Sequence, residues 1–185
     1  MTSCSTRFDC ESLNQALIAI DRARRSSAAP SALDLLRSAP HHLGVAHAGR
    51  DVRELCEAVD VALNRPSRRL AVYGSLGPGR PNHHVVAGIR GRWSRGTVAG
   101  TLHDSGWGAT MGYPGMIWRP GGDPIIVNLL ESDELHEHWA RLDAFEGGAY
   151  VRVLVPVETG AGMCVVANLY EIREHPASNP PARRG

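Results

Sequence analysis

The 185-residue sequence contains no lysine, because all 20 of its basic residues are arginine. Without lysine, a protein cannot form a lysine Schiff base, and it cannot use the lysine of a P-loop or of a protein kinase. The 20 basic and 19 acidic residues leave a formal charge of +1. This balance lacks the electrostatic signature of nucleic-acid or anionic-lipid binding. The composition therefore predicts neither a nucleic-acid partner nor a membrane partner.

Long apolar runs and paired cysteines are also missing. No stretch approaches the roughly 20 apolar residues that a membrane-spanning helix needs. The first residues lack the basic and then apolar pattern of a secretory signal, which favours a cytoplasmic protein. The four cysteines show no Cys-x-x-Cys spacing, and this is typical of reduced thiols in the cytoplasm. They are Cys4, Cys10, Cys56 and Cys164.

The spacing of apolar residues divides the chain into two main parts. Residues 1–68 carry apolar side chains at helical spacing and are predicted to form an N-terminal helical extension. The residues with this spacing are Leu13, Ala16, Leu17 and Ile20, and then Val52, Leu55, Cys56, Val59 and Leu63. Between these two helices, Ser31 is expected to cap a short helix around residues 33–36. At the other end, the proline-containing residues 176–185 are expected to be a disordered tail.

From residue 69 to residue 175 the apolar period changes to the value of two that is typical of strands. Strands are predicted at 70–73, 97–102, 125–130, 150–157 and 163–170, with one helix before the last two of them. A glycine-containing turn separates these last two strands, which favours a hairpin. Short strands with frequent glycine and proline between them favour a small closed or strongly curved sheet, so the predicted fold class is α+β.

The first segment that could carry chemistry is a predicted strand that runs into the turn Tyr73-Gly74-Ser75-Leu76. Gly74 lets the backbone approach a ligand closely. A turn of this kind presents consecutive backbone N–H groups, which can hold a carboxylate or an oxyanion. A purely structural turn would have the same sequence, so this segment alone leaves both interpretations open.

The second segment is the predicted late helix, over residues 132–148. Ser132 is expected to cap its N-terminus, and Asp133 and Glu134 would favour the positive end of the helix dipole. Gly147 is expected to end the helix. The predicted buried stripe consists of Leu135, Trp139 and Leu142, with Phe145 at its edge.

Glu146 would lie on the same inward stripe, in the last turn of this helix. A carboxylate there faces the negative end of the helix dipole, and partial burial also opposes its ionisation. A glutamate whose pKa is raised toward neutrality can accept and return a proton. A frayed helix end with Glu146 in solvent is the alternative.

Together these segments resemble the gamma-glutamylcyclotransferase-like superfamily, which is also called the AIG2-like family. Five motifs typical of that family occur in its order between about residues 69 and 173. They are Tyr73-Gly74-Ser75-Leu76 followed by Gly79 and Asn82-His83, Gly100-Thr101-Leu102-His103-Asp104, Tyr113-Pro114-Gly115, Leu142-Asp143-Ala144-Phe145-Glu146-Gly147, and Tyr150-Val151-Arg152. Two segments depart from the family pattern: the loop at 105–112 is longer, and Val127-Asn128-Leu129-Leu130 stands where a Gly-Glu-Leu-Tyr-like strand is usual.

The resemblance implies a small mixed β-barrel with flanking helices over residues 69–175 and a cavity at one end. It also implies an enzyme that needs no metal or cofactor and releases 5-oxoproline and a free amine from a γ-glutamyl amide. The substrate would be a γ-glutamylamine or a γ-glutamyl-protected metabolite. Glu146 is the expected general acid/base. The expected binding residues for the γ-glutamyl group are Tyr73, Gly74, Ser75 and Leu76. Tyr150 would hydrogen-bond the substrate or only pack at the start of its strand.

Three other kinds of site have weaker support. The histidine pairs 41–42, 83–84 and 136/138 are too close in sequence to share a metal easily, so no metal site is predicted. Ser75 as a nucleophile, with His83 or His103 as its base, lacks the Gly-x-Ser-x-Gly frame. Arg90, Arg92 and Arg95 around Trp93 faintly resemble a single-strand nucleic-acid surface, but with balancing acidic residues elsewhere a solvated loop is the favoured interpretation.

A hypothesis of a different class is that the fold serves as a non-catalytic module that binds a ligand or a partner, because fold does not determine function. Residues 1–68 lie outside the resemblance. In such a module they could form the contact surface for the partner. They could instead support a homodimer, or they could cover one face of the barrel.

Overall fold

The computed structural model describes residues 13–15, 17–18, 21, 52–104, 106, 108–109, 112–160 and 163–173. The expected helix at 33–36 and the expected tail at 176–185 lie outside these residues. Within them, residues 13–15, 17–18 and 21 are helical, and helix α3 spans Val52–Ala62. None of the described helices is both long and apolar enough to cross a membrane.

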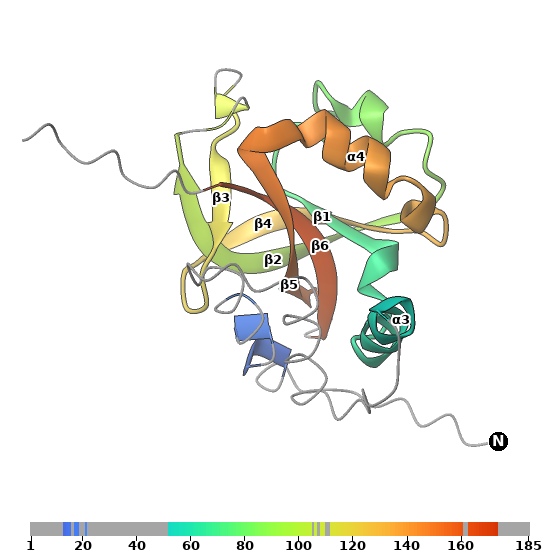
Figure 1. Ribbon diagram of the computed structural model, residues 1–185. Coiled ribbons are helices and arrows are strands. Elements are labelled where there is room, and N and C mark those ends of the chain that lie inside the picture. Colours follow the sequence, from blue (N-terminus) through green and yellow to red (C-terminus); the bar gives the residue numbers. More distant parts are fainter. Residues whose placement is uncertain are drawn as a thin grey trace, which may run out of the picture.

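Six strands form one mixed sheet in the order β3-β2-β4-β1-β6-β5. They are β1 Arg69–Val72, β2 Arg92–His103, β3 Gly115–Trp118, β4 Asp123–Glu131, β5 Tyr150–Thr159 and β6 Cys164–Ile172. An additional pairing between β2 and β5 closes β2, β4, β1, β6 and β5 into a barrel, and β3 extends the sheet from β2 (Figure 1). The β1–β6 pair is parallel and the other pairs are antiparallel. The predicted small mixed β-barrel is therefore confirmed.

The β5–β6 hairpin follows the pattern expected from its sequence. β5 contains alternating valines, and its Tyr150 pairs with Ile172 at the open end of the hairpin. β3 was absent from the sequence prediction. Its four residues are all buried, so they give no alternation of apolar and polar side chains.

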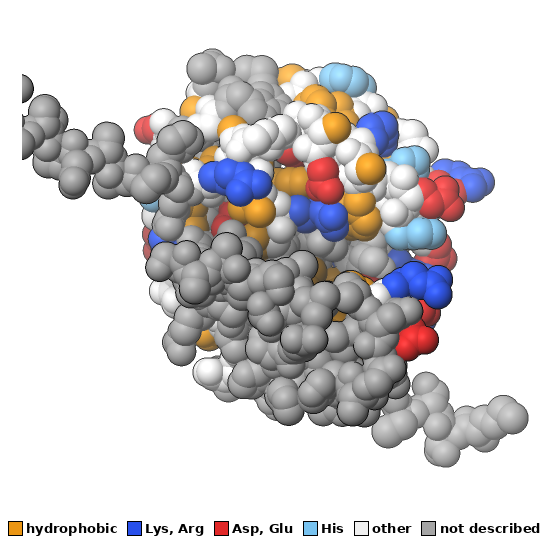
Figure 2. Space-filling model, viewed as in Figure 1, with side chains coloured by type: hydrophobic (Ala, Val, Ile, Leu, Met, Phe, Trp, Pro, Cys, Tyr) orange, Lys and Arg blue, Asp and Glu red, His pale blue; other side chains and the backbone are white. Residues whose placement is uncertain are grey.

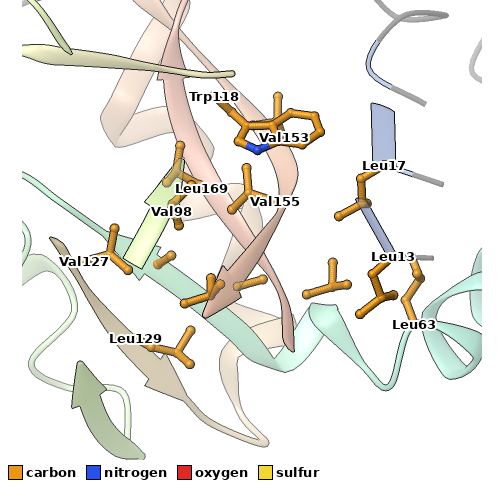
Figure 3. Close-up of a cluster of buried hydrophobic side chains, with 14 of the residues drawn as sticks. Leu13, Leu17, Leu63, Val98, Trp118, Val127, Leu129, Val153, Val155 and Leu169 are labelled. Atoms are coloured by element: carbon orange, nitrogen blue, oxygen red, sulfur yellow. The ribbon is translucent and has the colours of Figure 1, made fainter. Parts of the chain in front are cut away.

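Two clusters of buried side chains form the core. The first cluster occupies the barrel and includes Val98, Val127, Val155 and Leu169 (Figure 3). Four residues of the N-terminal part also belong to this cluster: Leu13, Leu17, Val59 and Leu63. These N-terminal side chains therefore pack in the same core as the barrel.

The second cluster lies between the sheet and the segments that follow β1 and β4. It includes Leu70 and Val72 of β1, Leu135, and Leu142 of the short helix α4, Trp139–Glu146. This cluster fixes α4 against the end of β1 (Figure 1), and the functional cavity described below forms at that junction.

The prediction of one continuous helix over residues 132–148 is wrong. A 3-10 turn, η4 at Leu135–Glu137, comes first, and α4 has only eight residues. The hydroxyl of Ser132 accepts a hydrogen bond from the Glu134 N–H at 3.1 Å, but it does not cap α4.

The two carboxylates expected in the first turn of that helix form tertiary ion pairs instead. Asp133 pairs with Arg68 at 2.7 Å, and Glu134 pairs with Arg90. Both carboxylates are thus directed to other segments of the chain rather than to the positive end of a helix. Local helix propensity is a weak preference, and tertiary contacts override it here.

Candidate active site

A cavity with about 430 Å³ of empty volume, its mouth included, lies where the end of β1 meets the end of α4. Its walls come from β1 and the following turn, the loop before β3, the last residue of α4, and the hairpin strands. The lining residues are Ala71, Val72, Tyr73, Gly74, Ser75, Leu76, Gly108, Tyr113, Pro114, Glu146, Tyr150 and Tyr170. The structure thus brings together every residue that the sequence proposed for the site.

The turn after β1 is held closed by the segment that follows it. The Asn82 side chain donates to the Ser75 hydroxyl at 2.9 Å, and the Asn82 N–H donates to the Ser75 carbonyl at 3.0 Å. Nδ1 of His83 donates to the Leu76 carbonyl at 3.1 Å. Within the described part of the chain, the N–H groups of Ser75 and Leu76 donate to no carbonyl. These N–H groups belong to residues that line the cavity and are therefore candidate donors to an anionic group.

Tyr73 has a structural role in addition to its place in the cavity wall. Its hydroxyl donates to the Tyr170 carbonyl and accepts from the Met116 N–H, both at 3.0 Å. Burial raises the pKa of this phenol well above its usual value, so the hydroxyl stays protonated. Tyr73 therefore connects β1 to β3 and β6 and gives the turn a fixed starting point.

Among the described residues that line the cavity, Glu146 is the only charged one. Only 8% of its surface is exposed, and no described residue gives it a hydrogen bond or an ion pair. Burial raises its pKa from 4.5 to about 7. Of the two causes expected from the sequence, burial raises this pKa in the folded protein. A carboxyl group whose pKa is strongly raised in a cavity is typical of functional sites.

Tyr150 is 8% exposed and begins β5 beside Glu146. Its hydroxyl accepts a hydrogen bond from the Gly108 N–H, and burial is the main cause of its raised pKa. This contact holds the loop before β3 against the cavity. Gly106 has a φ of +88°, and a Cβ there would lie 2.4 Å from the Tyr150 hydroxyl, so glycine is required for this close approach.

Sequence reasoning did not propose Tyr170, Tyr113, Pro114 or Gly108 as site residues. Tyr113 and Pro114 were part of a family motif, and this was a usable signal. Tyr170 lies in a strand whose last seven residues are all buried, so its sequence context resembles that of a core residue. Its hydroxyl nevertheless donates to Oδ1 of Asp143 at 2.6 Å.

The other kinds of site considered from the sequence were a serine–histidine pair, a metal site and a nucleic-acid surface. The Ser75 hydroxyl is bonded to Asn82, and Nδ1 of His83 is bonded to a backbone carbonyl, so these contacts do not form a serine–histidine pair. In the described part of the chain, no group of three or more His, Cys, Asp or Glu side chains could hold a metal ion. Acidic and basic side chains are interspersed on the face that Figure 2 shows, without a patch of one sign.

Comparison with known proteins agrees with the fold. Residues 70–184 match the sequence profile of the family described as gamma-glutamyl cyclotransferase, AIG2-like, and the chain belongs to this family. None of the curated protein sequences compared with the chain matches it.

Several solved structures are similar to the chain. An AIG2-like protein from Mus musculus is 26% identical, with a TM-score of 0.46, and the match covers 59% of this chain and 80% of that one. YkqA from Bacillus subtilis is 28% identical, with a TM-score of 0.45, and the match covers 57% of this chain and 36% of that one. A structure named gamma-glutamyl cyclotransferase is 16% identical, with a TM-score of 0.42, and the match covers 57% and 66% of the two chains.

Proposed function

We propose that the protein is a γ-glutamyl cyclotransferase, which converts a γ-glutamyl amide into 5-oxoproline and a free amine. The observation that carries this proposal is the position of Glu146. Its buried carboxyl group, which has no partner among the described residues, borders the same cavity as the turn at residues 73–76. The turn offers N–H donors for an anion, and the carboxyl group offers a base with a pKa of about 7.

In the proposed reaction the substrate supplies its own nucleophile. The Glu146 carboxylate accepts a proton from the substrate α-ammonium group, and the resulting amine attacks the γ-carbonyl carbon. The bond from that carbon to the leaving nitrogen then breaks, and Glu146 returns the proton to this nitrogen. The new ring nitrogen releases a second proton, and the free amine takes one from water, which balances the reaction.

The turn and the cavity walls would supply the remaining requirements. Backbone N–H groups of Ser75 and Leu76 would hold the α-carboxylate or the oxyanion of the intermediate. The narrow cavity would keep the glutamyl chain bent, so that the attacking nitrogen stays close to the carbonyl carbon. Tyr150 would contact the substrate through the part of its hydroxyl that does not face Gly108.

The test measures 5-oxoproline by mass spectrometry after incubation with a panel of γ-glutamyl amines and γ-glutamyl amino acids. Glu146→Gln should lower turnover by about 100-fold or more, because the amide cannot transfer the proton. Binding of 5-oxoproline, measured by calorimetry, should be retained. Glu137→Gln is the matched control, since Glu137 is exposed and lies outside the cavity.

Release of 5-oxoproline by the wild-type protein and its loss in Glu146→Gln would support the enzyme. Equal turnover in both proteins would remove Glu146 from the mechanism. Binding of the compounds without any turnover would favour the non-catalytic module instead.

A further inference from the structure

The last turn of α4, which carries Glu146, needs support from outside the helix. α4 has eight residues, and no side chain caps its N-terminus. Isolated helices shorter than about 12–15 residues are marginal in water. The direction of this turn must therefore be set by contacts with other elements.

Asp143 receives three hydrogen bonds of this kind from strands β5 and β6. Arg152 of β5 donates to both of its carboxylate oxygens, from Nε at 2.9 Å and from Nη2 at 3.1 Å. The Tyr170 hydroxyl of β6 donates to Oδ1 at 2.6 Å. Residues three apart lie on neighbouring parts of a helix surface, so a fixed Asp143 also fixes the orientation of Glu146.

Arg152 is itself held rigidly. Its guanidinium group lies 4.4 Å from the centre of the Trp139 ring, and Nη1 donates to Oδ1 of Asn168 at 3.3 Å. The Asn168 amide donates in turn to the Pro66 carbonyl at 2.7 Å. The indole N–H of Trp139 donates to the Ser67 carbonyl at 3.1 Å. Both neighbours of the guanidinium group are thus anchored to the segment before β1.

These contacts define a clamp that consists of Arg152, Asp143 and Tyr170. We propose that Arg152 is a positioning residue, which through Asp143 holds the Glu146 carboxyl group in the cavity. This inference rests on the proposed function for its role in turnover. Arg152 does not line the cavity, and it borders an outer hollow on the other side of Glu146. Three of its donors are already used by Asp143 and Asn168.

The charge state of the clamp fits this role. Burial opposes ionisation of Asp143, but the hydrogen bonds from Arg152 and Tyr170 outweigh it and hold its pKa below the usual range. The ionised pair is therefore stable at neutral pH. Lysine would not replace Arg152, because an ammonium group cannot bond both carboxylate oxygens and Asn168 in one plane.

Burial raises the pKa of Glu146. If loss of the clamp lets water reach the carboxyl group, this pKa should fall, so it reports whether the clamp holds Glu146 in the cavity. The other titratable groups around Glu146 lie just after β1, in β5, in β6, just after β6, and in helix α4 itself. They are Tyr73, Tyr150, Tyr170, Arg152, Arg173 and Asp143. The tyrosines are neutral at pH 7, and Asp143 and Arg152 neutralise each other.

The experiment compares Arg152→Lys with wild type in protein labelled with ¹³C-glutamate, with the Glu146 carboxyl signal assigned by its absence in Glu146→Gln. The Glu146 pKa should fall from about 7 toward 4.5 as water reaches the carboxyl group. The kcat for 5-oxoproline release should fall at least about tenfold, because misplacement of a catalytic group by about 1 Å can cost 100-fold. KM should change by less than about twofold.

Two further variants make the experiment decisive. Asp143→Asn removes the other half of the pair and should shift the Glu146 pKa in the same direction, which covers a failure of Arg152→Lys to fold. Arg92→Lys is the matched control, because Arg92 is also a strand arginine that pairs with a carboxylate, Glu131 at 2.5 Å, but lies away from the cavity. It should leave both the pKa and kcat unchanged.

An unchanged Glu146 pKa in folded Arg152→Lys would overturn the clamp. A raised KM at unchanged kcat would also overturn it, since Arg152 would then bind substrate directly. If the wild-type protein releases no 5-oxoproline from any compound, the proposed function fails. The pKa measurement would still decide whether Arg152 positions Glu146.

Discussion

Glu146 shows how one side chain can be unfavourable for folding and useful for chemistry. It is buried without a protein partner in the described part of the chain, so the folded protein favours its neutral form. A pKa of about 7 makes both protonation states available near neutral pH. Proton transfer in both directions requires this property.

The activity should therefore depend on pH through Glu146. The carboxylate must be ionised to accept a proton, so kcat/KM should decrease as the pH falls below about 7. The decrease should approach tenfold per pH unit. Initial rates of 5-oxoproline release between pH 5 and 8 measure it. A rate that stays constant down to about pH 5 would show that the group in use has an ordinary glutamate pKa.

The raised pKa of Glu146 also predicts how the stability of Glu146→Gln differs from that of wild type at each pH. The pKa is 4.5 for an unperturbed glutamate and about 7 in the folded protein, so the folded state binds more protons between these values. The contribution of Glu146 to wild-type stability should thus be most favourable below about pH 4.5 and should be lost as the pH rises through about 7. The loss is up to about 3 kcal/mol.

Because glutamine does not ionise, the variant should avoid this loss. Its free energy of unfolding, measured in urea, should exceed that of wild type at pH 8, and this advantage should shrink toward pH 5. An advantage that grows as the pH falls would have the wrong sign for a group with a raised pKa.

At the scale of the element, α4 depends on how it ends as well as on the clamp. Gly147 follows Glu146 with φ +67° and ψ −166°, a backbone region that is essentially limited to glycine. This conformation turns the chain away from the helix, so that the 3-10 turn at Gly147–Ala149 leads directly into β5. The glycine thereby separates the helix that carries Glu146 from the strand that carries Tyr150.

Gly147→Ala should destabilise the protein by about 1–3 kcal/mol. A Cβ at this position would meet no atom within 4 Å, so the cost is one of backbone conformation alone. Gly148→Ala is the control, since Gly148 also has open space around a Cβ but no positive φ. Thermal unfolding compares the two variants. Equal melting temperatures for them would show that the backbone at Gly147 can relax without cost.

The elements also show what sequence could and could not predict. The β5–β6 hairpin and α3 have periodic apolar patterns, and the sequence identified both. The family motifs located the turn after β1, Glu146 and Tyr150. The break in the helix after Ser132 was not predicted from local sequence, and the ion pairs of Asp133 and Glu134 at this point are with Arg68 and Arg90, which are distant in the chain. Tyr170 was missed because only the folded structure places its hydroxyl beside Asp143.

At the scale of the whole molecule, the barrel core is not built by the barrel alone. Leu13 and Leu17 have exposed fractions of 5% and 1%, and they belong to the same cluster as strand residues such as Val155 (Figure 3). Most of the apolar residues that line the cavity belong to the second cluster, including Leu76 and Tyr150, whereas Ala71 belongs to the first. Stability and activity should therefore respond differently to changes in the N-terminal part.

Leu17→Ala should lower the free energy of unfolding by about 2–5 kcal/mol. KM for a γ-glutamyl compound should stay unchanged at a temperature where the variant is folded, because Leu17 does not line the cavity. Urea unfolding and steady-state kinetics measure the two quantities. Unchanged stability would show that this side chain does not contribute to the core. The expected homodimer through residues 1–68 stays a prediction, which sedimentation of the wild-type protein can test.

The parallel pairing of β1 with β6 has a consequence for biosynthesis. Leu70 lies opposite Asn168 and Ala71 opposite Leu169, so the earliest strand of the ring is the neighbour of the latest one. During synthesis on the ribosome, this edge of β1 stays unpaired until β6 has been translated. Pairings so distant in sequence form slowly and leave nascent chains prone to aggregation. A polypeptide that stops before β6 would lack both the closing strand and Tyr170, so no partial translation product would hold a complete pocket.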